Sequence, residues 1–124
     1  RLTIRNLSPE QLGLYLQKPY LSKEAKKLLA KVQSVRKRIA ALDRELDTLR
    51  DERSTLRQQE ERIRKNVKIL KDTPAEREMR TRYLEKLERA EKRLGEIRAR
   101  IVELEEQKDD AEGRLAELIE QYGK

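Results

Sequence analysis

Apolar residues recur along this chain in two long stripes whose spacing alternates between four and three residues. A mean period of 3.5 residues held over this length indicates helices wound as a left-handed coiled coil. The first stripe consists of Leu28, Val32, Val35, Ile39, Leu42, Leu46, Leu49, Leu56, Ile63, Val67 and Leu70. The second consists of Tyr83, Leu87, Ala90, Leu94, Ile97, Ile101, Leu104, Ala111, Leu115, Leu118 and Tyr122.

Signals for helix ends lie on both sides of the break between the stripes. Thr73 is placed as an N-cap, Pro74 as the first helical residue and Glu76 as the reciprocal partner of a capping box. Ser22 is a second N-cap before the first stripe, and Gly123 follows the second stripe as a helix terminator. The sequence therefore predicts a helix over 23–71, a turn at 72–73 and a helix over 74–122.

Two helices of equal length joined by so short a turn are expected to fold back on each other. In that arrangement every apolar layer of one stripe meets a layer of the other, for example Leu46 with Ile101 and Leu56 with Ala90. The alternative is one helix running through Pro74 into a parallel dimer, but proline inside a helix costs about 3 kcal/mol. The predicted fold class is all-α, a long antiparallel two-helix coiled-coil hairpin over 22–122.

Residues 1–21 differ from the rest of the chain and form a predicted base segment. Residues 2–5 alternate between apolar and polar like a short strand. Ser8–Gln11 is a capping box that begins a short helix reaching about residue 17, which we expect to pack near Leu29 and Ile119. A lone strand needs a sheet, so we expect the hairpin to project from a β-containing domain outside this chain.

Three polar residues interrupt the stripes. One interpretation is that they mark partner contact or lock the register of the helices. The other is that long polar side chains reach out of a shallow two-helix interface into water, and we favour it because such an interface is never deep. These residues are Arg53, Glu60 and Lys108, which face Leu94, Leu87 and Ile39 in the predicted register.

Composition excludes several kinds of function. Charged residues make up 44% of the 124 residues and aromatic residues 3%, which is typical of disorder, but the sustained period argues for helices. The chain has no His and no Cys, so the usual metal ligands, the thiol nucleophile and the imidazole base are missing. We expect no enzyme activity, cofactor, metal site or transmembrane helix. Because the chain begins with Arg1, we expect it to be a piece of a longer protein.

Two motifs beside the predicted turn resemble a known family. The segments Gln59–Val67 and Arg82–Glu88, with Arg1–Ser8 as the link from a β-rich domain, are similar to the coiled-coil region of bacterial mucoidy inhibitor A-like proteins. This resemblance implies the hairpin architecture, a bacterial origin and often export, leaving cytoplasm and periplasm both open, and it implies no reaction. The short helix before a long hairpin also resembles the arm of seryl-tRNA synthetases, in shape alone.

Positive charge is concentrated around the turn. Residues 53–93 hold 14 basic and eight acidic residues, a net +6 of the chain's +7. A basic surface attracts polyanions by counterion release, whereas charges on helix pairs are more often solvated and paired at i,i+4. The candidate basic patch consists of Arg62, Arg64, Lys65, Lys68, Lys71, Arg77, Arg80 and Arg82.

These observations predict a structural arm that binds protein partners, including a second copy of the chain. Two hairpins can pair as a four-helix bundle that buries apolar residues outside the two stripes. The candidate residues for this self-association are Leu29, Leu84, Val102 and Ile119. The alternative is an arm whose basic end binds RNA, DNA or an anionic surface.

Overall fold

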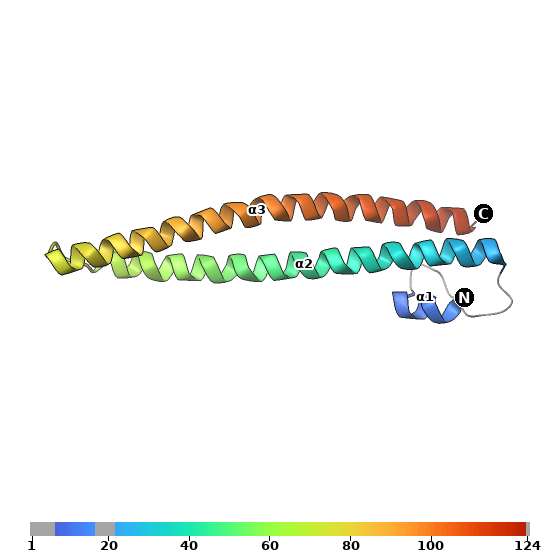
Figure 1. Ribbon diagram of the computed structural model, residues 1–124, viewed down its shortest axis with the longest axis horizontal. Coiled ribbons are helices and arrows are strands. Elements are labelled where there is room, and N and C mark those ends of the chain that lie inside the picture. Colours follow the sequence, from blue (N-terminus) through green and yellow to red (C-terminus); the bar gives the residue numbers. More distant parts are fainter. Residues whose placement is uncertain (1–6, 17–21, 124) are drawn as a thin grey trace. The chain divides into compact units, whose positions relative to one another are not determined.

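A computed structural model describes residues 7–16 and 22–123, and it is an antiparallel helical hairpin. The helices are α1 (Pro9–Tyr15), α2 (Lys23–Lys68) and α3 (Pro74–Gly123), and α2 and α3 lie side by side (Figure 1). The predicted all-α fold class is therefore confirmed. The strand predicted at residues 2–5 falls outside the described residues, and no strand occurs within the ranges that are described.

The chain divides into two compact units, to which α2 and α3 both contribute. The terminal unit comprises Arg1–Glu45 and Leu104–Lys124, and the turn unit comprises Leu46–Glu103. Each unit has its own apolar interior, so each is described separately below. Within the described ranges, no helix combines the length and the apolar character that crossing a bilayer requires.

The terminal unit has a three-helix interior because α1 covers the start of α2. As predicted, Ser8 and Gln11 form a capping box: the Gln11 amide donates to Ser8 Oγ at 3.2 Å and the Ser8 amide to Gln11 Oε1 at 2.8 Å. The Gln33 side chain of α2 donates to the carbonyl oxygen of Pro9 at 2.7 Å and so fastens α1 to α2. The interior residues are Leu7, Leu12, Leu29, Val32 and Leu118.

The interior of the turn unit is formed by α2 and α3 alone. Its apolar side chains are buried in the part away from the turn and less buried toward the turn. Its buried apolar residues are Leu46, Leu49, Ala90, Leu94, Ile97 and Ile101. Nearer the turn, Leu56, Ile63 and Leu87 are only half-buried. The predicted stripes are thus the contact surfaces of both helices, and the depth of burial varies along them.

The connection between the helices is longer than predicted, because α2 ends at Lys68 rather than at residue 71. The Leu70 amide donates to the carbonyl of Val67, which tightens the end of the helix, and the chain then needs residues 69–73 to reverse direction. The backbone groups released in this way are satisfied from α3. Arg80 Nη2 donates to the Leu70 carbonyl at 3.4 Å, and the Lys71 amide donates to the Glu76 carboxylate.

The predicted caps are present, with one difference in the second capping box. The Ala25 amide donates to Ser22 Oγ at 3.1 Å, and the Glu76 amide donates to Thr73 Oγ1 at 3.1 Å. The Glu76 carboxylate, however, accepts from the amide of Lys71 instead of completing the box at Thr73. An N-cap side chain normally satisfies one of the unpaired amides of the first turn. Here the Glu76 side chain stabilises the turn as well.

Candidate functional site: the charged surfaces of the turn unit

The basic patch predicted from the sequence separates into neutralised and unpaired cations. Lys65 lies 3.4 Å from Glu61 and Arg77 lies 3.5 Å from Asp72, both measured between nitrogen and carboxylate oxygen. Arg64 lies within 4 Å of two carboxylates, and Arg80 is engaged with the turn. Within the described part of the chain, the patch members other than Arg80 that have no carboxylate within 4 Å are Arg62, Lys68, Lys71 and Arg82.

A basic groove opens beside the helix interface near the turn. It has a volume of about 560 Å³, and half-buried Leu56, Ile63 and Tyr83, together with Ala90, form its apolar part. No carboxylate lines this groove. Its polar rim consists of Gln59, Arg62, Asn66, Lys86 and Arg89.

The residues of this basic groove also test the predicted helix register. The groove brings together the predicted pairs Leu56 with Ala90 and Ile63 with Tyr83. The Lys86 ammonium lies 6.0 Å from the centre of the Tyr83 ring, at the outer limit of a cation–π contact. The register of the turn unit is therefore as predicted, and Tyr83 adds an aromatic surface to the groove.

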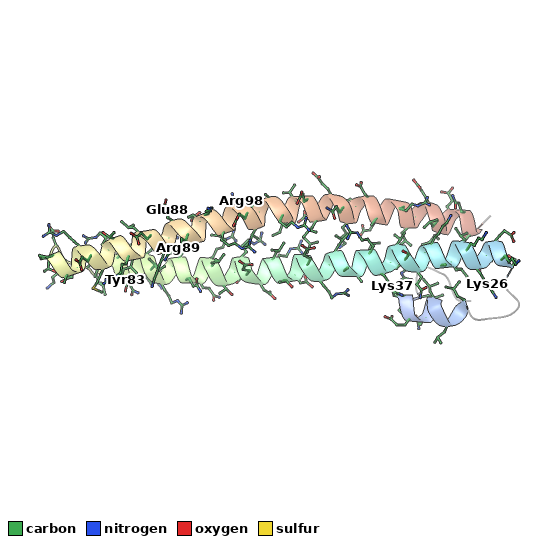
Figure 2. All side chains as sticks on the ribbon, viewed as in Figure 1. Lys26, Lys37, Tyr83, Glu88, Arg89 and Arg98 are labelled. Carbon is green, nitrogen blue, oxygen red and sulfur yellow. The ribbon has the colours of Figure 1, made fainter. Side chains whose placement is uncertain are left out.

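Two members of the rim, Lys86 and Arg89, are absent from the predicted patch. The prediction followed runs of basic residues in the sequence, whereas these cations alternate with acids. Lys86 immediately precedes Leu87 and Arg89 precedes Ala90, so both flank the interface on the same side of α3. Figure 2 labels Tyr83, Glu88 and Arg89, and helical spacing places Glu88 on the other side of α3, away from Arg89. The groove could have been predicted from the sequence by noting which charged residues lie directly beside the apolar stripe of α3.

A buried carboxyl group occupies the other side of the same interface. Glu60 is only 4% exposed, so the prediction that it reaches into water is wrong. Its Oε2 atom has no hydrogen-bond partner, and the closest cation on it is Arg64, at 3.9 Å. The side chain lines a cavity of about 140 Å³ together with Arg53, Arg57, Glu91, Leu94 and Arg98.

The pKa of Glu60 is raised above its usual value. Burial is the main cause, followed by a hydrogen bond with Glu91 and by the negative charge of that residue, while Arg64 and Arg57 act in the opposite direction. Burial and a nearby negative charge both disfavour the charged form of a carboxyl group. Glu60 therefore lies at the interface of α2 and α3 in surroundings that favour its neutral form.

The other two polar members of the stripes are partly exposed, closer to the prediction that these side chains reach into water. Lys108 retains 31% of its side-chain exposure and pairs with Asp43 at 2.7 Å and with Glu112 at 3.8 Å. Arg53 is half-buried beside the Glu60 cavity. Only Glu60 is enclosed, because its shorter side chain cannot reach past the neighbouring helix to water.

An ion pair also joins the helices of the turn unit at its surface. Arg93 donates to Glu52 through Nε at 2.5 Å and through Nη2 at 2.8 Å, a two-pronged contact across the interface. The hydrogen bond from Arg93 lowers the pKa of Glu52, and the same bond raises the pKa of Arg93. The pair lies at the surface and fixes register more than it adds stability.

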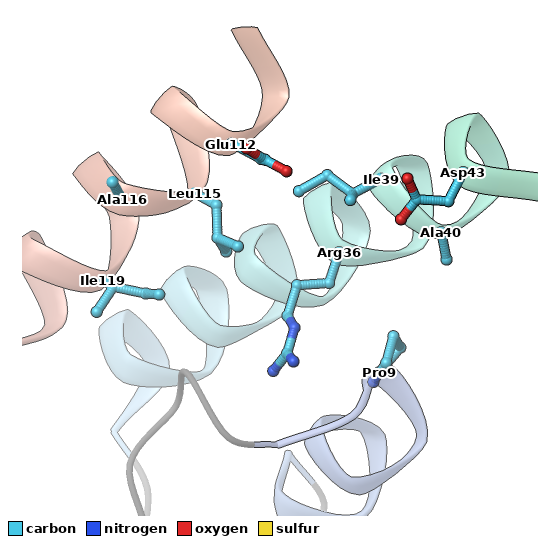
Figure 3. A pocket seen from close by; sticks show the side chains of 9 residues that line it. All are labelled: Pro9, Arg36, Ile39, Ala40, Asp43, Glu112, Leu115, Ala116 and Ile119. Carbon is cyan, nitrogen blue, oxygen red and sulfur yellow. The ribbon is translucent and has the colours of Figure 1, made fainter. Parts of the chain in front are cut away.

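A second groove lies in the terminal unit, and its lining is mainly apolar. Its volume is about 580 Å³, and Figure 3 shows Arg36 reaching between Pro9 of α1 and Ile119 of α3. Asp43, one of its two carboxylates, is already paired with Lys108. The remaining lining residues are Ile39, Ala40, Glu112, Leu115 and Ala116.

The four residues proposed for self-association do not share one environment. Leu29 is fully buried in the interior of the terminal unit, and Ile119 is half-buried against it, so both are covered within the chain. Leu84 and Val102 of the turn unit are 51% and 54% exposed and remain available to a partner. The sequence also predicted that the short helix packs near these two residues, and Leu12 of α1 does lie in one apolar cluster with Leu29, with Ile119 packed against it.

Within the described residues, no group of three or more carboxylates is arranged to hold a metal ion. Comparison of the chain with protein-family models, curated proteins and solved structures found no match. The function is therefore argued from the surfaces described above.

Proposed function

We propose that this chain is a non-catalytic interaction module, a coiled-coil hairpin that associates with a second copy of itself. The basic groove of the turn unit is the observation that carries the proposal. It combines an apolar floor with a polar rim, and Arg and Tyr are among the residue types enriched in protein interfaces. The exposed side chains of Leu84 and Val102 add apolar surface that a partner can cover.

The test is the mass of the purified chain in solution over a wide concentration range. Sedimentation equilibrium should give a mass that rises from one chain toward two as concentration increases. A chain that stays monomeric at the highest concentration contradicts the proposal. The resemblance to mucoidy inhibitor A-like proteins, with its bacterial origin, stays a prediction beside this proposal.

A second candidate function is polyanion binding by the same end of the hairpin. The observation that favours it is the set of unpaired cations, because neutralised phosphates release counterions in proportion to the contacts made. The structure changes which substitutions test this idea, since Arg64 and Lys65 already have carboxylate partners. The cations to reverse are Arg62, Lys68, Lys71 and Arg82.

Fluorescence anisotropy with labelled RNA and DNA across a salt series separates the two functions. Polyanion binding predicts an affinity that falls steeply with salt and a shallower slope after Lys68→Glu with Lys71→Glu. The matched control is Lys27→Glu with Lys37→Glu, two exposed lysines of the terminal unit with the same change in charge. A slope unchanged by the first pair contradicts polyanion binding at this surface.

A further inference from the structure

A further stripe of residues runs along the exposed side of α3 within the turn unit. Its spacing alternates between four and three residues, which keeps all members on one side of the helix. The residues at its two ends, Leu84 and Val102, are 51% and 54% exposed. Every member lies within 46–103, so the stripe belongs to one unit. We call it the Leu84 stripe, and it consists of Leu84, Glu88, Glu91, Gly95, Arg98 and Val102.

The Leu84 stripe reads the same in both directions along α3. Its spacings are four, three, four, three and four residues, so it is symmetric about position 93. A second copy of α3 that runs antiparallel about that centre therefore meets the stripe layer by layer, and a two-fold axis forms each layer twice. The layers are Leu84 with Val102, Glu88 with Arg98 and Glu91 with Gly95.

The charges of the Leu84 stripe are complementary in this antiparallel arrangement. Glu88 and Arg98, both labelled on α3 in Figure 2, are exposed, and in the described chain neither has an oppositely charged group within 4 Å. Each Glu88 lies opposite Arg98 of the other copy, so two ion pairs flank the centre of the contact. Complementary charges of this kind mainly select the partner and its register.

The centre of the Leu84 stripe leaves room for a second helix. A Cβ added at Gly95 would meet nothing within 4 Å, so the surface of α3 is open there. Glycine is unfavourable inside a helix, and its missing side chain lets another chain approach closely. Glu91 of the second copy lies opposite Gly95, and the open space accommodates its carboxylate, which lies 3.7 Å from Arg64 Nη2 of its own chain.

We propose that two copies of the chain pair through antiparallel α3 helices along the Leu84 stripe. The apolar ends cover each other, and the ion pairs lie between those ends and the centre. The partner is a second copy rather than a nucleic acid, because Glu88 and Glu91 repel a polyanion whereas a second stripe brings Arg98 to each Glu88. This inference rests on the self-association proposed above and names its surface and orientation.

Charge reversal tests the pairing directly. Glu88→Arg and, separately, Arg98→Glu should each weaken self-association about tenfold or more, because like charges then face each other twice. Glu88→Arg combined with Arg98→Glu in one chain should restore self-association, since every facing pair again has opposite signs. Sedimentation equilibrium measures the dissociation constant of each variant, and circular dichroism checks that each stays helical.

The matched control is Glu85→Arg, which makes the same change in charge at another exposed position of the turn unit. Helical spacing places Glu85 away from the Leu84 stripe, so this variant should self-associate like the wild type. Leu84→Ser tests the apolar ends of the contact. It removes an exposed apolar side chain and should weaken self-association without lowering the helical content.

The outcomes separate the inference from the function it rests on. A wild-type chain that is monomeric at every concentration contradicts self-association itself. A dimer that Glu88→Arg and Arg98→Glu both retain, but that Arg62→Glu with Arg89→Glu in the basic groove dissociates, overturns the contact along the Leu84 stripe and leaves self-association standing. A dimer lost in both single variants and not restored in the combined variant overturns the pairing of Glu88 with Arg98. A dimer lost in each single variant and restored in the combined one supports the inference.

Discussion

The two units use the same pattern of apolar residues and reach different depths of burial. In the terminal unit α1 lies across the helix pair, and Leu12, Leu29 and Leu118 are at most 1% exposed. In the turn unit no third helix is present, Leu56 and Ile63 stay half-buried, and the most buried side chain near the turn is that of Glu60. A third helix closes an apolar interior, while two helices alone leave it shallow enough for charged groups to line both sides.

The largest expected effect is that of truncating the interior of the terminal unit. Leu29→Ala should lower the free energy of unfolding by about 2–5 kcal/mol, since a fully buried leucine leaves a cavity that the surroundings fill only in part. Leu56→Ala in the turn unit is the matched variant and should cost roughly half as much, because its side chain already contacts water. Urea unfolding followed by circular dichroism measures both. Equal costs would contradict the difference between the units.

A smaller effect is expected at the buried carboxyl group. Glu60→Gln should raise the free energy of unfolding at pH 7 by about 1 kcal/mol, because the amide carries no charge to bury. The raised pKa of Glu60 means that the folded chain holds its proton more tightly than the unfolded chain does. Wild-type stability therefore falls as pH rises from the ordinary carboxyl pKa through the raised value.

The advantage of Glu60→Gln over the wild type should accordingly grow across that pH window and vanish below it. Thermal unfolding of both proteins at a series of pH values measures this difference. Glu88→Gln is the control, since it removes one exposed carboxylate from the same unit. A difference between wild type and Glu60→Gln that is independent of pH would mean that the carboxyl group titrates normally.

The smallest effects are expected at two glycines, one in each unit. Gly95→Ala should stabilise the chain by about 0.5–1 kcal/mol, because an added Cβ meets nothing within 4 Å and alanine favours the helix. Gly13→Ala should not, because its Cβ would lie 2.8 Å from Gln33 Nε2, the group that donates to Pro9. Melting temperatures of the two variants give the comparison. Stabilisation by both would mean that Gln33 is not needed to hold α1.

Most of the fold could be predicted because local signals and the apolar period agree. Ser8, Ser22 and Thr73 each cap the helix that the sequence assigned to them, and the predicted pairing of Leu56 with Ala90 is present. The end of α2 was misplaced by three residues, since the length of a reversing connection depends on how α3 satisfies its backbone. Arg80 and Glu76 supply those hydrogen bonds from positions that no local rule connects to Leu70 and Lys71.

The charged surfaces were predicted less completely. Runs of basic residues located the region, but pairing across and along the helices decides which cations are neutralised. Lys65 and Arg77 pair with local carboxylates, while Lys86 and Arg89 line the same groove as Arg62 from the opposite helix. A linear sequence shows that these charges exist and does not show which of them share a surface.

The sequence by itself determined the helices, their caps and the register of the hairpin, because those features depend on spacing and on residues close together in the chain. Only the tertiary structure decided that Glu60 is enclosed and which cations of the basic patch lie beside a carboxylate. The burial of a side chain depends on which element of the fold packs over it. In a chain this rich in charge, the neighbouring element decides whether a side chain stabilises the interior, has its pKa raised by burial or remains exposed to a partner.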